Sequence, residues 1–457
     1  IFYLNYHMVF DLGKKFIEEK KFKKALLFFL NELKKGNNTA GTYFFLGIIY
    51  FELNKIKDSI NYYKLALKIS PKSINIIINL ANAYLVRGSF LSAKSLYLKA
   101  IKLNKYEPRG YYGLYVIKPQ YLTKYIQDLN DIKNNNNLNN DFLVEYLLSK
   151  IAKQNNNHDL ELQHLHRFQK QCFKSRNDHN LQGLFYYNKI ISKYFNKIHF
   201  NNFCSKDKNF NNISPIFIIG LPRSGSTLIE SMISNANYNV VSLGETSIFN
   251  TEIINLIKNQ IFKKNFNIEN YSLNLDVKQL KKNVIDRYEN YFSKNDKDLF
   301  FVDKSLENFF NIEIILKVFP NAKFINCRRN YNDNAIAIYQ SMLPDLPWTH
   351  YISDILEYID SYIKIMTFYE KKLQNNILSI DLDNLTYEQK FYSKKIFKFC
   401  DLLWTPDILN FNKRKNLLIK TLSNNQVRQK IFSYDNNKYK IYDKLLDSFK
   451  DKYSWLN

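Results

Sequence analysis

Hydrophobic positions follow two different patterns along this chain. Up to residue 107, apolar and small residues recur at helical spacing, and the pattern repeats every 34 residues. At 216–219 four consecutive apolar residues, three of them β-branched, have the composition of a central strand in a parallel sheet. Hydrophobic residues then return to helical spacing from 226 to 233. These patterns predict a helical first part and an α/β second part.

The repeat of the first part sets small residues and aromatic residues at fixed positions. The aligned positions are Leu12-Gly13, Leu46-Gly47 and Leu80-Ala81; Phe16, Tyr50 and Tyr84; Ala25, Ser59 and Ala93; and Phe29, Tyr63 and Tyr97. This pattern resembles tetratricopeptide repeats, in which small residues let neighbouring helices approach closely. We therefore expect a repeat domain over 1–107, with three copies. Concave helical surfaces commonly bind extended segments, so a peptide or protein is a candidate partner of the repeats.

The region 108–212 loses the repeat but keeps hydrophobic residues at helical spacing. Runs of asparagine at 134–137 and 155–157 predict loops between its helices. We expect this region to close the repeat domain and to join it to an α/β domain over 213–457.

The candidate chemistry begins at Gly220, where the predicted strand ends and a turn leads into the helix from Ser226. A helix start offers unpaired N–H groups and the positive end of the peptide dipoles, which favours a bound phosphate. The loop lacks the Gly-Lys-Ser/Thr that would hold a metal-bound triphosphate. Its cation is Arg223, accompanied by hydroxyls. This set suits a single phosphate group without a metal.

Five local sequences extend this interpretation. The segment 220–228 resembles the 5′-phosphosulfate loop of the sulfotransferases, and 319–329 resembles the strand that leads to their 3′-phosphate site. Three shorter matches are Gly244-Glu245-Thr246, then Val302-Asp303-Lys304 with Asn308-Phe309, and Ser423-Asn424-Asn425-Gln426-Val427-Arg428-Gln429. The resemblance covers roughly 213–443. With the repeats, the chain resembles the tetratricopeptide-repeat sulfotransferases, and its second part is similar to the tyrosylprotein members.

The resemblance implies a fold, a reaction and a co-substrate. The fold would be a tetratricopeptide-repeat solenoid followed by a phosphate-loop-like α/β domain with a central parallel sheet. The reaction would move a sulfuryl group from 3′-phosphoadenosine-5′-phosphosulfate (PAPS) to an acceptor hydroxyl without a metal. A peptide or protein tyrosine and a glycan are both candidate acceptors, and the sequence does not choose between them.

The same resemblance implies roles for individual residues. The 5′-phosphosulfate would be held by Arg223, Ser224, Gly225, Ser226 and Thr227, and the 3′-phosphate by Arg329, Ser423 and Lys438. Lys304 is similar to the lysine that contacts the bridging oxygen, and Glu245 resembles the general base. Positioned cations would supply most of the catalysis because charge grows on the leaving oxygen. The acceptor hydroxyl also needs a proton acceptor.

Simpler structural roles stay open for some of these residues. Lys304 could form a surface ion pair with the neighbouring Asp303, and Glu245 could be a carboxylate at a helix start. His350 is expected to be a packed histidine rather than a catalytic one.

Several positions depart from the family pattern. Asn330 and Tyr331 follow Arg329 where an Asp-Pro pair is usual, and Ala337 stands in place of a serine that would contact the 3′-phosphate. Tyr439 replaces a tryptophan. These departures keep open a second function, a catalytically degenerate scaffold that binds peptide segments through its repeats. A phosphate-loop kinase is disfavoured because the loop has no Gly-Lys-Ser/Thr.

Composition changes this interpretation little. The chain has 457 residues, of which 46% are hydrophobic, so two cores can be buried. Its net charge of +24 is typical of nucleic-acid-binding proteins. However, lysine is spread along the whole chain together with Asn, Ile, Tyr and Phe, as AT-rich coding would produce, and no nucleic-acid motif accompanies it. We therefore expect no nucleic-acid partner.

The remaining features concern the compartment. The four cysteines are far apart, which favours reduced structural thiols. No apolar run is long enough to cross a bilayer and no secretory signal is visible, so a cytoplasmic location is the default expectation. The chain begins with Ile1 rather than methionine, and we expect it to be a fragment that lacks earlier repeats.

Overall fold

The chain folds into two compact units, the first ending at Gln171 and the second beginning at Cys172. The computed structural model describes residues 2–135, 142–195, 199–201, 213–236, 240–261, 274–291, 299–413, 428, 435 and 438–456. Each unit is described by itself below. Our predicted boundaries at 107 and 212 remain predictions.

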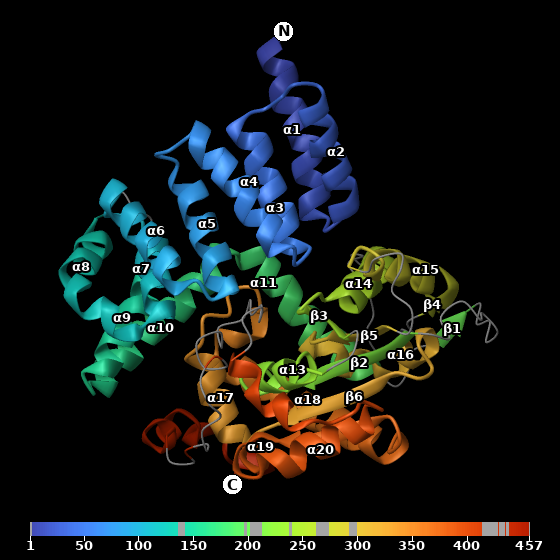
Figure 1. The fold of residues 1–457 in the computed structure, drawn as a ribbon. Coiled ribbons are helices and arrows are strands. Elements are labelled where there is room, and N and C mark those ends of the chain that lie inside the picture. The colour runs from blue at the N-terminus through green and yellow to red at the C-terminus, as the bar shows by residue number, and fades with distance from the viewer. Residues whose placement is uncertain are drawn as a thin grey trace. The chain divides into compact units, whose positions relative to one another are not determined.

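The first unit is helical in its described residues (Figure 1). Its α-helices are α1 (Phe2–Glu18), α2 (Phe22–Lys34), α3 (Ala40–Glu52), α4 (Ile56–Ile69), α5 (Ile74–Arg87), α6 (Phe90–Leu103), α7 (Pro108–Ile117), α8 (Ile126–Asn134), α9 (Phe142–Gln154) and α10 (His158–Ser175, which runs into the second unit), with a 3₁₀ helix, η1, at Pro119–Tyr125. Helices α1 to α6 form three consecutive pairs, which confirms the predicted tetratricopeptide-like solenoid.

In the first two pairs, a glycine in one helix lets an aromatic ring of the next helix pack against the backbone. A Cβ atom placed on Gly47 of α3 would lie 2.5 Å from the Tyr63 ring of α4, and one on Gly13 would lie 2.5 Å from the Phe29 ring. Ser59 also donates a hydrogen bond of 2.8 Å to the Gly47 carbonyl oxygen. The small residues that the sequence aligned are therefore needed at helix contacts.

Replacing Gly47 by alanine should destabilise the first unit, because the new methyl group has no space beside Tyr63. Overpacking of this kind costs about 1–3 kcal/mol. The matched control is Gly41→Ala in the same helix, where a new Cβ atom would lie 3.5 Å or more from its nearest neighbours and alanine favours the helix by about 1 kcal/mol. Urea unfolding followed by circular dichroism compares the two variants. Equal midpoints would contradict the close contact.

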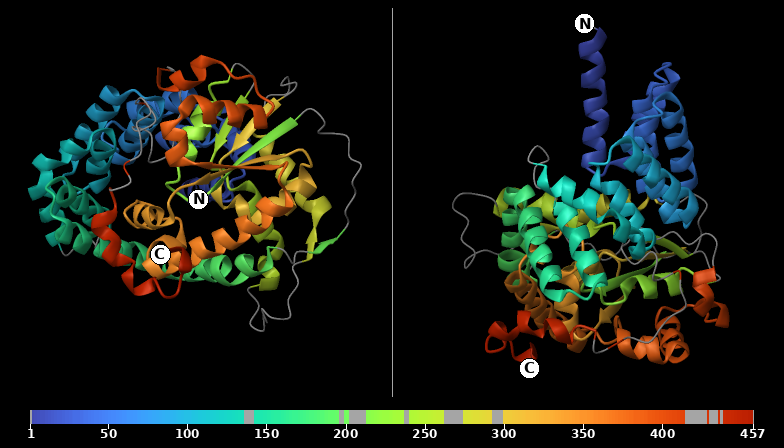
Figure 2. Two further views of the ribbon diagram at one scale, coloured as in Figure 1. Left: turned by 90° about the horizontal axis from the view of Figure 1, so that it is seen from below. Right: turned by 90° about the vertical axis from the view of Figure 1, so that its left-hand side faces the viewer.

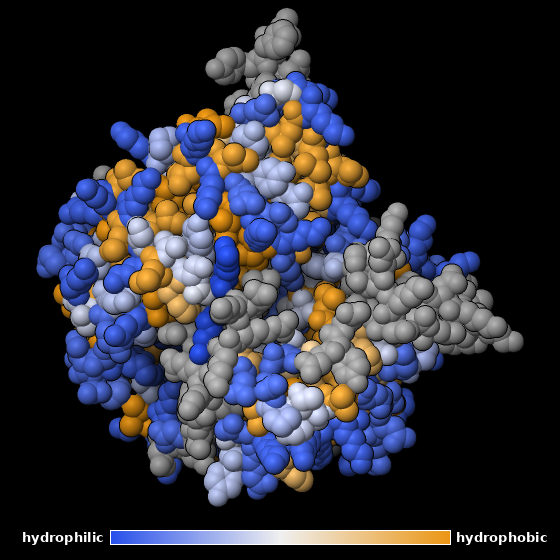
Figure 3. Space-filling model, in the orientation of Figure 1, coloured by the Kyte–Doolittle hydropathy of each residue, from blue (hydrophilic) through white to orange (hydrophobic). Residues whose placement is uncertain are grey.

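Hydrophobic side chains also reach the surface of the first unit. On the face drawn in Figure 3 they gather over its helices. Large exposed side chains include Leu27, at 64%, and Leu91, at 86% of full exposure. Surfaces that bind other proteins often expose apolar area in this way. We therefore keep a protein partner of the repeats as a proposal.

A five-stranded parallel sheet forms the centre of the second unit. The strand order is β3-β5-β2-β6-β7, with β2 at Ile213–Gly220, β3 at Val240–Gly244, β5 at Leu299–Asp303, β6 at Lys323–Arg328 and β7 at Ile377–Asp381. The apolar run at 216–219 is at most 1% exposed, as expected for a central strand. A separate parallel pair joins β1 (His199–Asn201) and β4 (Asn274–Asp276). The predicted parallel sheet is confirmed.

Helices cover both faces of the large sheet (Figure 2). The α-helices of this unit are α11 (Asn177–Leu184), α12 (Ser192–Tyr194), α13 (Ser226–Ile233), α14 (Ile248–Ile261), α15 (Val277–Tyr288), α16 (Ile312–Val318), α17 (Tyr331–Tyr339), α18 (Ile352–Lys372), α19 (Leu382–Tyr387) and α20 (Gln389–Phe399). The π-helix η2 (Phe185–Ile191) and the 3₁₀ helices η4 (Leu306–Asn311), η5 (Pro347–Thr349), η6 (Pro406–Lys413), η7 (Lys440–Leu445), η8 (Asp447–Phe449) and η9 (Ser454–Leu456) complete it.

Side chains of β6 show which helices lie on opposite faces. The Lys323 ammonium lies 5.1 Å from the centre of the Phe399 ring in α20, whereas Asn326 accepts a hydrogen bond of 2.6 Å from Tyr362 in α18. Residues three apart in a strand point to opposite faces, so α20 and α18 cover different faces of the sheet.

Parallel strands bring their carboxyl ends to one edge of the sheet. Gly220 of β2 is in register with Cys327 of β6, and Asp303 of β5 ends beside Gly244 of β3. The loops after these strands therefore start at the same edge, where α/β sheets commonly bind ligands.

None of the helices in the described part of the chain combines the length and hydrophobicity that crossing a bilayer requires.

Candidate active site

The loop between β2 and α13 is shaped by two glycines. Gly220 has a φ of +136°, and a Cβ atom there would lie 2.5 Å from the carbonyl oxygen of Cys327. Gly225 has a φ of +88°, and a Cβ atom there would lie 2.5 Å from the Leu382 side chain. Side chains at either position would be strained and would clash. The turn consequently begins and ends at residues that only glycine suits, and α13 begins directly after it at Ser226.

Hydrogen bonds hold the loop against the end of β6 and against α17. Arg223 has a φ of +68°, a left-handed conformation that is uncommon for a residue with a side chain. Its carbonyl oxygen accepts a hydrogen bond of 3.1 Å from Arg329 Nη1. Asn334 Nδ2 donates to the Pro222 carbonyl oxygen at 2.6 Å, and Ser224 Oγ donates to the Leu221 carbonyl oxygen at 2.6 Å. The fold thus joins two arginines that are 106 positions apart in sequence.

A third cation and a phenol lie near this pair. The ring centre of Tyr439 is 4.9 Å from the Arg329 guanidinium carbon and 5.5 Å from Lys438 Nζ. Burial raises the pKa of the Tyr439 phenol, but Lys438, Arg329 and Arg223 together outweigh burial and lower it. Burial raises the pKa of the nearby Asp383, and Arg329 partly opposes that shift. Two of the predicted cofactor-binding cations, Arg329 and Lys438, therefore lie beside one phenol, and the charge of a third, Arg223, also lowers its pKa.

Lys304 and Glu245 form an ion pair at the same edge of the sheet. Lys304 Nζ lies 2.5 Å from Glu245 Oε1, and the Lys304 side chain is fully buried whereas that of Glu245 is 54% exposed. Burial by itself lowers the pKa of Lys304, but Glu245 and a second carboxylate, Glu230, outweigh it and raise the pKa. Lys304 is therefore a buried, charged residue and is not part of a surface pair with Asp303.

Asp303 instead fixes the ends of β3 and β5. Its Oδ2 atom accepts hydrogen bonds from Thr246 Oγ1 at 2.6 Å and from the Tyr288 hydroxyl at 2.7 Å. Its Oδ1 atom accepts one of 2.8 Å from the Ser305 backbone N–H. These bonds hold the segment that carries Glu245 against the segment that carries Lys304.

The sequence interpretation did not include Glu230 or Tyr439 among the site residues. Glu230 lies in α13, where its Oε1 atom accepts a hydrogen bond of 2.6 Å from Ser242 Oγ and its Oε2 atom lies 3.7 Å from Lys304 Nζ. Its signal in the sequence was a single carboxylate within the apolar run from Leu228 to Ile233. Tyr439 entered only as a departure from the family pattern.

The other predicted residues have varied positions. Ser226 and Thr227 are buried at the start of α13, and Ser423 lies outside the described residues. Ala337 is buried in α17, and Asn330 caps that helix by accepting a hydrogen bond from the Asp333 N–H. His350 is 1% exposed, its ring lies 5.9 Å from that of Phe173, and burial lowers its pKa to about 4. This buried environment agrees with the expectation that His350 is a packed histidine.

Cysteines and metal ligands add little to the site. Cys172, Cys327 and Cys400 are buried free thiols, and Cys204 lies outside the described residues. Across the residues that the structure describes, no group of three or more His, Cys, Asp or Glu side chains is arranged to hold a metal ion.

Comparison with known proteins found relatives of parts of this chain. An uncharacterized protein of Aquifex aeolicus (strain VF5) is 30% identical over 248 residues, which are 51% of this chain and 31% of that protein. The tetratricopeptide repeat protein 21 homolog of Caenorhabditis elegans is 28% identical over 102 residues, 22% of this chain and 8% of that protein. The chain thus matches less than a third of the length of either relative.

One solved structure, the sulfotransferase domain from the curacin biosynthetic pathway, aligns with 50% of this chain and 96% of its own. The TM-score is 0.30 and the identity is 15%. The family model described as "Sulfotransferase family" matches residues 215–406, which include most of β2, the loop after it, Glu245, Lys304 and Arg329. Residues 215–406 of this chain therefore match the sulfotransferase family.

Proposed function

We propose that this chain transfers a sulfuryl group from PAPS to an acceptor hydroxyl. The observation that carries the proposal is the hydrogen bond from Arg329 to the Arg223 carbonyl oxygen beside the start of α13. It brings one cation of the predicted 5′-phosphosulfate site and one of the predicted 3′-phosphate site to the same loop. Peptide or protein tyrosines and glycans remain the candidate acceptors.

The residues present fit a doubly phosphorylated nucleotide. Arg329 and Lys438 supply two positive charges beside Tyr439, and Arg223 supplies a third on the loop that Arg329 contacts. The N-terminus of α13, which follows that loop, supplies backbone N–H groups. In this proposal Arg223 to Thr227 hold the 5′-phosphosulfate, while Arg329, Lys438 and Ser423 hold the 3′-phosphate. The bound co-substrate supplies a sulfuryl group whose bond to a phosphate oxygen is weak enough to break.

In this proposal Lys304 acts on the leaving group of the transfer, and Glu245 acts on the acceptor hydroxyl. Lys304 keeps its proton, because two carboxylates hold its pKa high, and its charge can neutralise the negative charge on the leaving oxygen. Glu245 is exposed enough to meet an acceptor and can take the proton from its hydroxyl. For that step the Glu245 carboxylate turns away from Lys304 and toward the acceptor.

Calorimetry with adenosine 3′,5′-bisphosphate tests the co-substrate. We expect binding of equal strength with EDTA and with magnesium, and we expect no comparable binding of magnesium–ATP. A preference for magnesium–ATP would favour a kinase. Binding of neither nucleotide, together with tight peptide binding by the repeats, would favour the scaffold. Mass spectrometry of tyrosine peptides and glycans incubated with PAPS then identifies the acceptor.

A further inference from the structure

The proposed function gives Glu230 no direct role in the transfer, yet its carboxylate lies beside the Lys304 ammonium. The Glu230 side chain is 13% exposed and its Oε2 atom is 3.7 Å from Lys304 Nζ. Its other oxygen accepts the hydrogen bond from Ser242 in β3. A carboxylate with so little solvent stays ionised only where a cation or hydrogen-bond donors stabilise it. Glu230 and Lys304 therefore balance each other's charge inside the protein.

The two carboxylates around Lys304 differ in their access to solvent. Glu245 faces the outside, whereas Glu230 faces the inside of the unit. When Glu245 turns to an acceptor and takes a proton, it becomes neutral and no longer attracts the ammonium. Without Glu230, Lys304 would then be a buried charge that neither carboxylate balances, which is unfavourable. Glu230 continues to balance the charge of Lys304 at this stage, because it keeps its own charge and its position.

We propose that Glu230 is a positioning residue that keeps the charged Lys304 side chain in place while Glu245 exchanges a proton with the acceptor. This inference rests on the proposed sulfuryl transfer. Glu230 lies one turn beyond Ser226 in α13, the helix that begins at the phosphate-binding loop. The helix that carries Ser226 and Thr227 of the phosphate-binding loop therefore also carries the carboxylate beside Lys304.

The surrounding groups determine how the pair responds to pH. They are Ser242 from β3, Asp303 from the end of β5, Cys327 from β6, and Glu245. Burial raises the pKa of Glu230, Lys304 and Ser242 oppose that shift, and Glu245 and Asp303 add to it. Glu230 is in turn one of the two carboxylates that raise the pKa of Lys304. Removing the negative charge of Glu230 therefore lets Lys304 lose its proton at a lower pH.

Glu230→Gln tests the proposal because glutamine has nearly the same shape without the charge. Single-turnover transfer from PAPS to an acceptor identified by mass spectrometry is measured from about pH 6 to about pH 10, and bisphosphate affinity is measured by calorimetry. We expect the rate to fall at least about tenfold while affinity changes less than about threefold. We also expect an alkaline limb to enter this pH range in Glu230→Gln but not in the parent, in which Glu230 and Glu245 keep Lys304 protonated.

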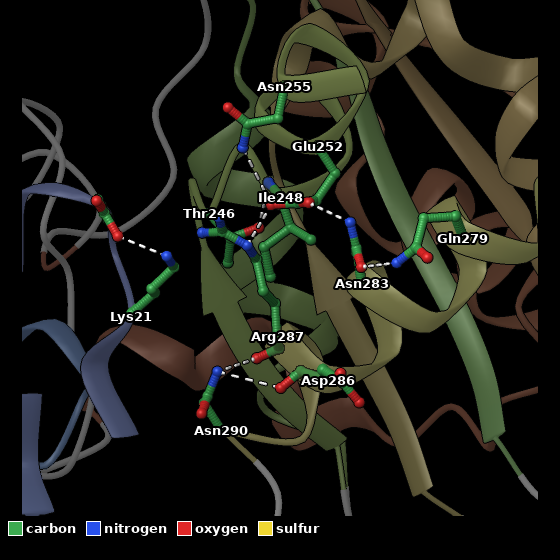
Figure 4. Close-up of polar contacts among 11 residues, drawn as sticks. Lys21, Thr246, Ile248, Glu252, Asn255, Gln279, Asn283, Asp286, Arg287 and Asn290 are labelled. Atoms are coloured by element: carbon green, nitrogen blue, oxygen red, sulfur yellow. Dashed lines mark hydrogen bonds and ion pairs between the residues drawn. The ribbon is translucent and has the colours of Figure 1, made fainter. Parts of the chain in front are cut away.

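Glu252→Gln is the matched control for loss of a buried, paired carboxylate. The Glu252 side chain in α14 is 5% exposed, pairs with Arg287 at 2.5 Å and accepts a hydrogen bond from Asn283 (Figure 4). That variant should lose stability without bringing an alkaline limb into this pH range. In the second test variant, Ser242→Ala, Glu230 keeps its charge but loses its hydrogen bond, so the rate should fall less and no alkaline limb should enter the range.

The outcomes separate this proposal from the proposed function. If the parent protein transfers the sulfuryl group and Glu230→Gln keeps the parent rate and pH profile, the positioning role is wrong and the proposed function stands. If Glu230→Gln does not fold, a parent rate in Ser242→Ala overturns the role instead. A parent protein that neither binds the bisphosphate nor transfers the group overturns both.

Discussion

Replacing Glu245 by glutamine is expected to lower the rate of sulfuryl transfer by about 10²- to 10⁴-fold, the usual effect of losing a general base. Glutamine keeps the size and polarity of the side chain but cannot take a proton from an acceptor. Because the Glu245 side chain is 54% exposed, the substitution should leave folding and bisphosphate affinity close to those of the parent. Single-turnover kinetics and calorimetry measure the two quantities separately.

The control for this variant is Glu388→Gln, which removes an exposed carboxylate that lies between α19 and α20 of the same unit. It should transfer at the parent rate. Parent-like transfer by Glu245→Gln would show that another group accepts the proton. The companion variant Lys304→Ala is less informative, because it leaves Glu230 and Glu245 without their buried cation and should destabilise the protein by about 3–5 kcal/mol.

Replacing Arg329 by alanine should weaken bisphosphate binding by about 100-fold. The loss combines a charge-assisted contact to the ligand, worth about 1.5–3 kcal/mol, with loss of the hydrogen bond that holds the strained Arg223 backbone. Arg329→Lys keeps the charge without the forked guanidinium and should weaken binding by only about tenfold. Calorimetry with adenosine 3′,5′-bisphosphate ranks the variants.

The neighbouring residue provides a control with the same change in net charge. Arg328 points to the other face of β6, where its guanidinium pairs with Asp381 through Nε at 3.1 Å and Nη2 at 2.9 Å. Arg328→Ala should therefore cost stability but little affinity. Equal losses in Arg328→Ala and Arg329→Ala would mean that general positive charge, rather than a contact at the loop, governs binding.

Much of the fold could be predicted because it depends on local patterns. Small and aromatic residues at a 34-residue period predicted the helix pairs, and Gly47 against Tyr63 shows why that period exists: a helix contact must recur at the same place in each repeat. Local patterns likewise predicted a strand from the apolar run at 216–219, a turn from Gly220 and Gly225, and a helix from the spacing after Ser226. Each of these features requires residues that are close in sequence.

The arrangement of the site required the tertiary structure. The order β3-β5-β2-β6-β7 makes β3 and β5 neighbours, and only that order brings Glu245 to 2.5 Å from Lys304 across 59 positions of sequence. No local pattern contains strand order, because it is decided by how whole elements pack. For the same reason Glu230 was only an unexplained carboxylate in an apolar helix, and Tyr439 only a changed residue. The sequence determined which charged and polar side chains the chain carries. Tertiary packing determined which of those side chains lie close enough to interact.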